Sequence, residues 1–314
     1  MLELLLEPLH YQYMQHAILS SAIVGAVCAF LSAFLMLKGW SLIGDALSHS
    51  VVPGVAGAYA LGLPYSVGAF IAGFLASIGI ALLRSLSHLK EDAIIGFIFT
   101  TFFAAGLLLI SLNPTSINIE GIIFGSILTV SQSDLMQMLI IAGVSFVLLT
   151  LLWKDLMLVF FDETQASSVG LSPTILKIIF FTILSACTVA SLQTVGAILV
   201  IAMVITPGAT AYLLTDRFGL LLIIAITLGF VTSALGAYLS YYLNGATGGT
   251  IVLLQTLIFL CAFVFAPKYG VLANRRNAKH RASVGESVDE KSLEKQTVNK
   301  THAHNVVTSG GYHG

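Results

Sequence analysis

Charged side chains are what this sequence most conspicuously lacks. Asp, Glu, Lys and Arg together make up 9% of its 314 residues, while 57% are hydrophobic, and a soluble domain carries about 25% charged residues. So few charges cannot cover a surface that faces water, which excludes an ordinary soluble protein. We therefore expect the chain to use lipid as part of its solvent, as an integral membrane protein does.

Cysteine is also scarce. Cys28, Cys187 and Cys261 each lie inside an apolar run, and no two of them form a CxxC pair. We interpret all three as small buried hydrophobic side chains, so they carry no information about the redox compartment.

Three catalytic motifs are missing as well. The sequence holds no GxxxxGK[ST] phosphate loop, so the chain cannot hydrolyse ATP by that route. It also holds no HExxH and no GxSxG motif, which weakens the case for a membrane metalloprotease or a serine hydrolase. We therefore expect a protein that is not an enzyme.

What the sequence has in abundance is long apolar runs. A helix needs about 20 such residues to cross a bilayer, and eight or nine runs qualify, so we predict an all-α polytopic bundle. The boundary between the sixth and seventh runs rests on residues 193–196 alone, which leaves the count uncertain by one. A further apolar piece, 119–130, is too short to span. The nine runs are 17–37, 41–62, 64–84, 93–112, 135–153, 175–192, 194–214, 218–241 and 250–266.

The two ends of the chain differ from this core. Residues 1–16 lack Lys and Arg and have no cleavage-site pattern, so we expect a segment at the membrane surface rather than a removable signal peptide. Residues 17–267 are expected to form the transmembrane domain. The polar stretch 268–314 has no apolar period and is predicted to be a disordered tail. The short loops rich in Lys and Arg fall on the same side as this tail, which predicts that the tail is cytoplasmic.

Ionisable side chains inside an apolar run are candidates for function, because lipid makes them costly. Asp45 and His49 lie in the run 41–62, and their i, i+4 spacing places both on one face of a helix, about 5–6 Å apart at Cβ. A carboxylate oxygen and an imidazole nitrogen so placed can share a divalent cation, and this ligand pair suits Mn, Fe or Zn better than Cu(I). A simple Asp–His pair near the start of a helix is the other interpretation.

Three further residues in the predicted helices affect the helix backbone. Ser48 would either add a weak oxygen ligand or bond the preceding helical turn. Pro53 is expected to kink the helix one turn beyond His49, and Pro207 to bend or interrupt the run 194–214, because proline removes a backbone donor.

The residues around the pair resemble a known family. The stretch 37–54, LKGWSLIGDALSHSVVPG, is similar to the signature of permease subunits in the metal-ion ABC importers, which carry manganese, zinc or iron. In that family the Asp and His of GDALSH contact the passing cation, and they correspond here to Asp45 and His49. The segments 124–128 and 204–211 are also similar to segments of the family, and the resemblance extends to Gly270.

A polar interruption at 161–173 separates the fifth and sixth runs. Asp162 or Thr164 would cap a short helix there, and Gly170 followed by Pro173 would end it. Such a helix resembles the coupling helix by which ABC permeases dock onto their ATPase, with an Ala-x-x-x-Gly core. The resemblance assigns this coupling role to Asp162, Glu163, Ala166 and Gly170.

The resemblance implies a fold like that of the type II ABC importer permeases. It implies the transmembrane subunit of an ATP-driven importer in the bacterial plasma membrane, surrounded by lipid and paired with a second copy. Its partners would be a cytoplasmic ATPase and an extracytoplasmic metal-binding protein, with no nucleic acid. The cargo would be manganese, zinc or iron, bound only in transit, and the absence of thiolates favours manganese. The rival interpretation is a stand-alone secondary transporter or channel that uses Asp45 as a proton or ion relay.

Overall fold

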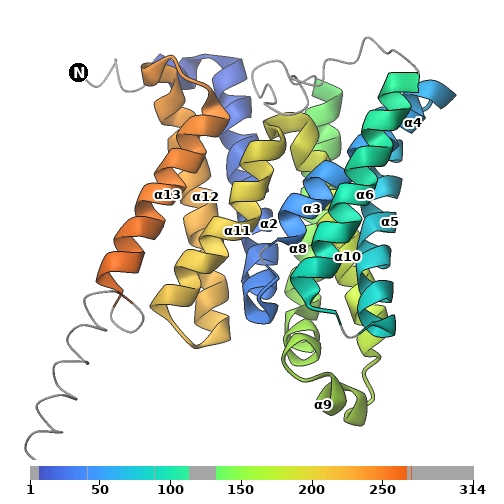
Figure 1. Cartoon of the computed structure of the whole chain (residues 1–314). Coiled ribbons are helices and arrows are strands. Elements are labelled where there is room, and N and C mark those ends of the chain that lie inside the picture. Colours follow the sequence, from blue (N-terminus) through green and yellow to red (C-terminus); the bar gives the residue numbers. More distant parts are fainter. Residues whose placement is uncertain (1–6, 41, 88, 113–131, 267–269, 271–314) are drawn as a thin grey trace, which may run out of the picture. The chain divides into compact units, whose positions relative to one another are not determined.

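The structure of the chain is a computed structural model, which describes residues 7–40, 42–87, 89–112, 132–266 and 270 (Figure 1). Every regular element within those ranges is a helix, which confirms the predicted all-α class. The chain divides into two compact units, Met1–Leu260 and Cys261–Gly314. The first unit holds the core and all the candidate site residues.

Seven helices within the described ranges are long and apolar enough to cross a membrane. They are α2 (Gln12–Lys38), α5 (Tyr65–Leu86), α6 (Glu91–Leu112), α8 (Gln132–Phe161), α10 (Pro173–Val195), α12 (Phe218–Leu243) and α13 (Thr247–Phe265). The remaining helices are shorter, namely α3 (Ile43–Ser50), α4 (Val52–Leu61), α9 (Glu163–Ser168) and α11 (Ala197–Leu214).

Two of the nine predicted runs differ from a simple spanning helix. The run 41–62 is divided into α3 and α4, with Pro53 in the first turn of α4. The run 194–214 forms α11, whose 18 residues span about 27 Å, slightly less than the hydrocarbon core of a bilayer. The weak boundary at 193–196 is a true break, because Gly196 (φ +84°) separates α10 from α11.

Some predicted segments lie outside the described residues. These are the short apolar piece 119–130, with the family-like segment 124–128 inside it, and the tail 268–314 apart from Gly270.

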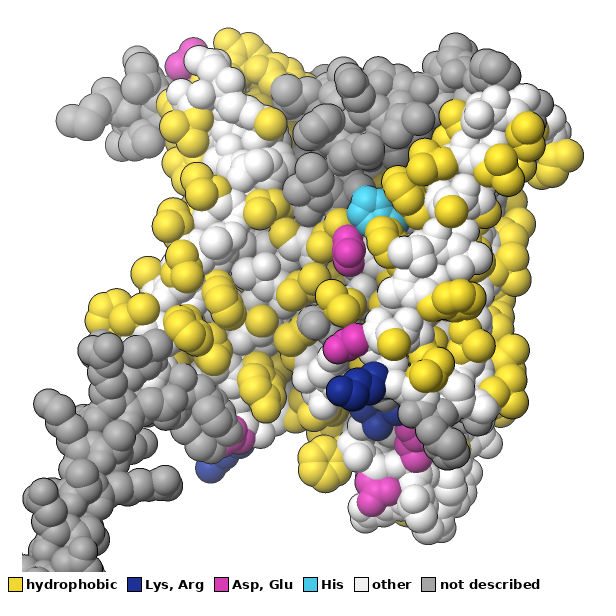
Figure 2. Space-filling view, in the orientation of Figure 1, with side chains coloured by type: hydrophobic (Ala, Val, Ile, Leu, Met, Phe, Trp, Pro, Cys, Tyr) yellow, Lys and Arg dark blue, Asp and Glu magenta, His cyan; other side chains and the backbone are white. Residues whose placement is uncertain are grey.

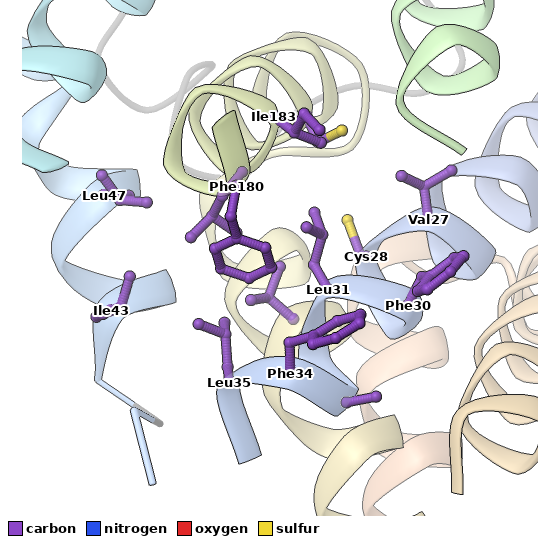
Figure 3. Close-up of a cluster of buried hydrophobic side chains, with 14 of the residues drawn as sticks. Val27, Cys28, Phe30, Leu31, Phe34, Leu35, Ile43, Leu47, Phe180 and Ile183 are labelled. Atoms are coloured by element: carbon purple, nitrogen blue, oxygen red, sulfur yellow. The ribbon is translucent and has the colours of Figure 1, made fainter. Parts of the chain in front are cut away.

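The first unit packs around α2, in which 83% of the most apolar 18-residue stretch is buried. Its main neighbours are α12, α11, α8 and α10. The ring of Phe34 on α2 lies 5.8 Å from Phe180 on α10 and 5.0 Å from Phe218 on α12, and Figure 3 shows Phe34 and Leu31 facing Phe180. Each such aromatic contact contributes about 0.5–1.5 kcal/mol beyond area burial. Close packing of this kind holds helices together in lipid, where the hydrophobic effect between them is absent.

Helices α2 and α12 approach so closely that only glycine fits at their crossing. A Cβ placed on Gly229 would lie 2.4 Å from the carbonyl oxygen of Gly25, and one placed on Gly25 would lie 2.5 Å from the carbonyl oxygen of Gly229. Two facing glycines therefore bring the two backbones into direct contact, as small residues commonly do between membrane helices.

Replacing Gly229 with alanine is therefore expected to destabilise the protein. The added methyl group meets backbone atoms, which cannot rotate away, so overpacking should cost about 1–3 kcal/mol. Thermal unfolding in detergent would measure the loss. The matched control is Gly143→Ala on α8, where no atom lies within 4 Å of an added Cβ and helix propensity favours alanine by about 1 kcal/mol. Equal melting temperatures for the two variants would contradict the close contact.

Candidate metal site and coupling helix

Asp45 and His49 meet on α3. The Nε2 atom of His49 lies 3.5 Å from Oδ1 of Asp45, and the two side chains are 29% and 43% exposed. Both groups are therefore open enough to be reached by an ion, and they present one oxygen and one nitrogen from a single helical face. Hard and borderline divalent cations accept this ligand combination.

The ends of α3 follow from local sequence. The helix starts after a turn in which Gly39 adopts φ +74°, and it ends at Ser50, just before the first turn of α4, which contains Pro53. Proline has no N–H to continue the ladder of hydrogen bonds. The hydroxyl of Ser48 donates to the carbonyl oxygen of Gly44 at 2.9 Å, so this side chain bonds the preceding turn.

Two phenyl rings of α6 cover one side of His49. The centroid of the imidazole lies 5.2 Å from that of Phe99 and 5.6 Å from that of Phe103, with interplanar angles of 69° and 81°. The two phenyl rings also stack on each other at 6.0 Å. One turn further, a Cβ on Gly106 would lie 2.9 Å from the backbone nitrogen of Pro53. Helix α6 therefore packs against both His49 and the α3–α4 break, and it restrains the imidazole beside Asp45.

The resemblance noted above implies that Asp45 and His49 contact a passing metal ion, and on that basis truncating either covering ring is expected to weaken cation binding. In Phe99→Ala or Phe103→Ala the imidazole gains freedom to turn away from Asp45. Loss of groups that orient a ligand typically lowers metal affinity about 10–100-fold, so the KM for metal uptake should rise about tenfold or more. Phe97→Ala is the matched control, because Phe97 lies on the same helix but is 60% exposed. Equal KM changes in all three variants would rule out a positioning role.

The polar segment at 161–173 contains the predicted short helix, α9. One carboxylate oxygen of Asp162 accepts from the backbone N–H groups of Thr164 (2.9 Å) and Gln165 (3.0 Å), so Asp162 is the N-cap. At the other end, the N–H of Gly170 bonds the carbonyl of Ser167 and the N–H of Leu171 bonds that of Ala166. Gly170 has φ +90°, which completes a Schellman motif. Ala166 is fully buried, whereas an added Cβ on Gly170 would meet no atom within 4 Å.

Glu163 binds two lysines from other helices. Its carboxylate lies 3.6 Å from Nζ of Lys38 on α2 and 2.5 Å from Nζ of Lys177 on α10. Partial burial opposes ionisation of Glu163. The hydrogen bond and charge of Lys177 and the charges of Lys38 and Arg84 outweigh it, so the pKa of this carboxyl lies below its usual value. Glu163 therefore anchors α9 to its own protein. The Lys and Arg side chains visible in Figure 2 lie toward the end that carries α9.

Pro207 does not interrupt its helix, so of the two effects expected from the sequence, a bend or an interruption, the interruption is contradicted. Helix α11 runs from Ala197 to Leu214 with Pro207 inside it. The hydroxyl of Ser32 on α2 donates to the carbonyl of Ile205 (3.1 Å) and accepts from the N–H of Gly208 (3.0 Å). A neighbouring helix thus supplies hydrogen bonds around the proline, a known way for membrane helices to tolerate it.

A family model described as the ABC 3 transport family matches residues 10–266. The chain belongs to the ABC 3 transport family. This ABC 3 protein is 72% identical over 275 residues to the chelated iron transport system membrane protein YfeC of Yersinia pestis, covering 88% of the chain and 94% of the relative. It is 46% identical over 269 residues to the manganese transport system membrane protein MntB of a Synechocystis strain, covering 86% and 88%.

A solved structure shows the same architecture. PsaBC from Streptococcus pneumoniae, in complex with a Fab, matches the ABC 3 chain with a TM-score of 0.76 at 34% identity, covering 88% of this chain and all of that one. The resemblance first drawn from the GDALSH stretch is confirmed. The ABC 3 chain is a membrane permease subunit and not an enzyme.

In this ABC 3 protein the site residues form two groups on different helices. Asp45 and His49 come together on α3, and the four residues assigned to coupling lie in and around α9. Among the residues that the structure describes, no group of three or more His, Cys, Asp or Glu could hold a metal ion. Asp45 and His49 are thus the only two candidate ligands that come together on α3 within the described residues.

Sequence reasoning missed the side chains that support both groups. Phe99 and Phe103, which cover His49, have the same i, i+4 spacing as Asp45 and His49. Nothing in the sequence distinguishes them from the other phenylalanines of the same apolar run. Lys38 lies within the family-like stretch 37–54, and its charge near the end of an apolar run was the only available signal. Ser32 carried no signal.

Proposed function

We propose that this chain is the membrane-spanning subunit of an ATP-driven importer for divalent transition-metal ions. The observation that carries the proposal is the 3.5 Å contact between Asp45 and His49 on a short helix in the family-specific stretch. Both side chains are partly exposed, and the phenyl rings of α6 close one side of the imidazole. An ion can therefore approach the pair only from the remaining sides.

The proposed cargo is manganese first, with iron and zinc as the alternatives. The pair offers oxygen and nitrogen without the thiolate ligands that favour zinc and Cu(I). Cys28 and Cys187 are buried, and the sulfur of Cys28 meets the hydroxyl of Ser191 at 3.8 Å, whereas Cys261 is exposed, contrary to the expectation that all three are buried. Ligand chemistry puts manganese first, whereas the 72% identity to a chelated iron transport protein supports iron.

Two ligands per chain suit transit better than storage. A complete ligand cage would trap the ion, whereas a sparse set holds it briefly, with water or a second copy of the chain completing the shell. In the proposed cycle an extracytoplasmic protein delivers the ion and a permease dimer forms the pathway. A cytoplasmic ATPase docks at α9 and its closure opens the inner side. The setting would be a bacterial plasma membrane.

Uptake of manganese, iron and zinc by cells lacking this gene tests the proposal. The gene would be restored as wild type or as His49→Ala, and cellular metal measured by mass spectrometry. Loss of one metal's uptake, rescued by the wild type alone, would identify the cargo. Unchanged uptake of all three metals after deletion would overturn metal import. Gradient-driven transport in liposomes that contain only this chain would instead support a secondary transporter.

A further inference from the structure

Glu163 is the point at which three helices are held together by charge. It is the first residue of α9, Lys38 is the last residue of α2, and Lys177 lies near the start of α10. The lysine side chains are only 19% and 20% exposed. Ion pairs that are partly buried are screened by salt less than exposed ones. The Lys38–Glu163 contact thus connects the short α9 helix directly to the end of α2.

Trp40, two residues after Lys38, is packed against the helices on either side of α9. After the turn at Gly39, the indole of Trp40 is buried, 3% exposed, with its ring centroid 5.4 Å from Phe160 and 5.6 Å from Phe181. Phe160 belongs to the last turn of α8, immediately before α9, and the guanidinium of Arg84 lies 4.9 Å from the indole. The turn after α2 is therefore anchored to the helices that flank α9.

Asp45 and His49 follow Trp40 by only a few residues. Helix α3 starts at Ile43, and Asp45 lies in its first turn. Helix α3 is short and ends next to Val51, where α4 begins. A small cavity of about 40 Å³ is lined by Trp40, Ile43, Arg84, Lys177 and Phe181, among others. The cavity leaves room for side-chain movement where α3 begins.

From this geometry we infer that the Lys38–Glu163 ion pair is the link that transmits movement of α9 to Asp45 and His49. The inference rests on the proposed function. A displacement of α9 would pull Lys38 through Glu163, move the turn that carries Trp40, and so shift the start of α3. Lys177 has a different role, since it holds the same carboxylate to α10, which touches α3 only by packing, whereas Lys38 is joined to α3 through the chain itself. Lys38 and Glu163 are thus positioning residues that act on the ion through α3.

The test uses the complete complex, with its ATPase and binding protein, in proteoliposomes loaded with ATP. The measured quantity is the number of manganese or iron ions moved per ATP hydrolysed. Glu163→Gln and Lys38→Met are expected to lower this ratio at least about fivefold, the lower limit of typical coupling between sites, while the ATPase stays bound. Lys38→Arg should restore the ratio because it keeps the charge. Lys177→Met is the matched control, since it removes the other ion pair of the same carboxylate, and its ratio should stay near that of the wild type.

Several results would overturn the link. One is a wild-type ratio in both Lys38→Met and Glu163→Gln. Another is an equal loss in Lys177→Met, which would mean that Glu163 only anchors α9. Release of the ATPase by Glu163→Gln would assign this side chain to docking. These failures are distinct from failure of the proposed function, in which the wild-type complex itself would move no metal.

Discussion

Replacing Asp45 or His49 with alanine is expected to abolish metal uptake while leaving the protein folded in the membrane. Each change removes one of the two proposed ligands of the ion. Loss of a group that merely orients a ligand costs about 10–100-fold in metal affinity, so loss of a ligand should cost at least that. Both side chains are partly exposed, so truncation leaves no cavity in the core.

Uptake of manganese and iron, with membrane insertion checked by blotting, would measure this effect. Ser48→Ala is a suitable control on the same helix. Ser48 is buried and donates to the carbonyl of Gly44, so its loss removes one hydrogen bond within α3 and leaves both ligands in place. Normal metal accumulation in cells carrying Asp45→Ala or His49→Ala would refute the assignment of the pair.

A bulky side chain at Gly170 is expected to release the ATPase from the complex. Gly170 ends α9, and an added Cβ would meet no atom of this chain within 4 Å. In Gly170→Trp the indole would therefore project outward, into the space where a partner's cleft would close on α9. The variant should fold, because only the local backbone is strained, at a cost of about 1–2 kcal/mol for a non-glycine residue with positive φ. Co-purification of the ATPase with the permease would measure the loss.

Backbone strain and bulk can be separated at this position. Gly170 has φ +90°, so Gly170→Ala carries the same backbone strain as the tryptophan variant but adds only a methyl group. We expect Gly170→Ala to retain most of the bound ATPase and Gly170→Trp to retain little. Equal amounts of ATPase recovered with Gly170→Trp and with the wild type would argue against docking at this end of α9.

The segment around α9 shows how much of a structure local sequence can predict. Asp162 as a helix cap and Gly170 as its end were predictable, because both act on backbone groups within a few residues. The side-chain partners of Glu163 were not. Lys38 is 125 positions away in the sequence, and nothing local distinguishes an acidic residue that faces a partner protein from one that binds its own helices.

The two prolines show the same contrast between what local sequence predicts and what contacts with distant residues decide. Pro53 and Pro207 both lie in predicted spans, and the loss of a backbone donor argues for a break in each. The chain does divide next to Pro53, whereas α11 continues through Pro207. The difference lies in Ser32, 176 positions from Gly208, whose hydroxyl supplies hydrogen bonds beside the second proline. Local chemistry sets the tendency to break, but a neighbouring helix decides the outcome.

The sequence by itself determined the membrane class, the approximate position of each helix, the family, and the pairing of Asp45 with His49. The membrane class, the helix positions and the pairing depend on composition or on spacing within a few turns, whereas the family came from the resemblance of the stretch 37–54 to a known signature. Only the tertiary structure decided that Phe99 and Phe103 cover His49, that Gly25 and Gly229 bring α2 and α12 together, and that Glu163 ties α9 to Lys38. These contacts join helices far apart in the sequence, and in an almost uniformly apolar chain the pattern of hydrophobicity does not specify which helix faces which.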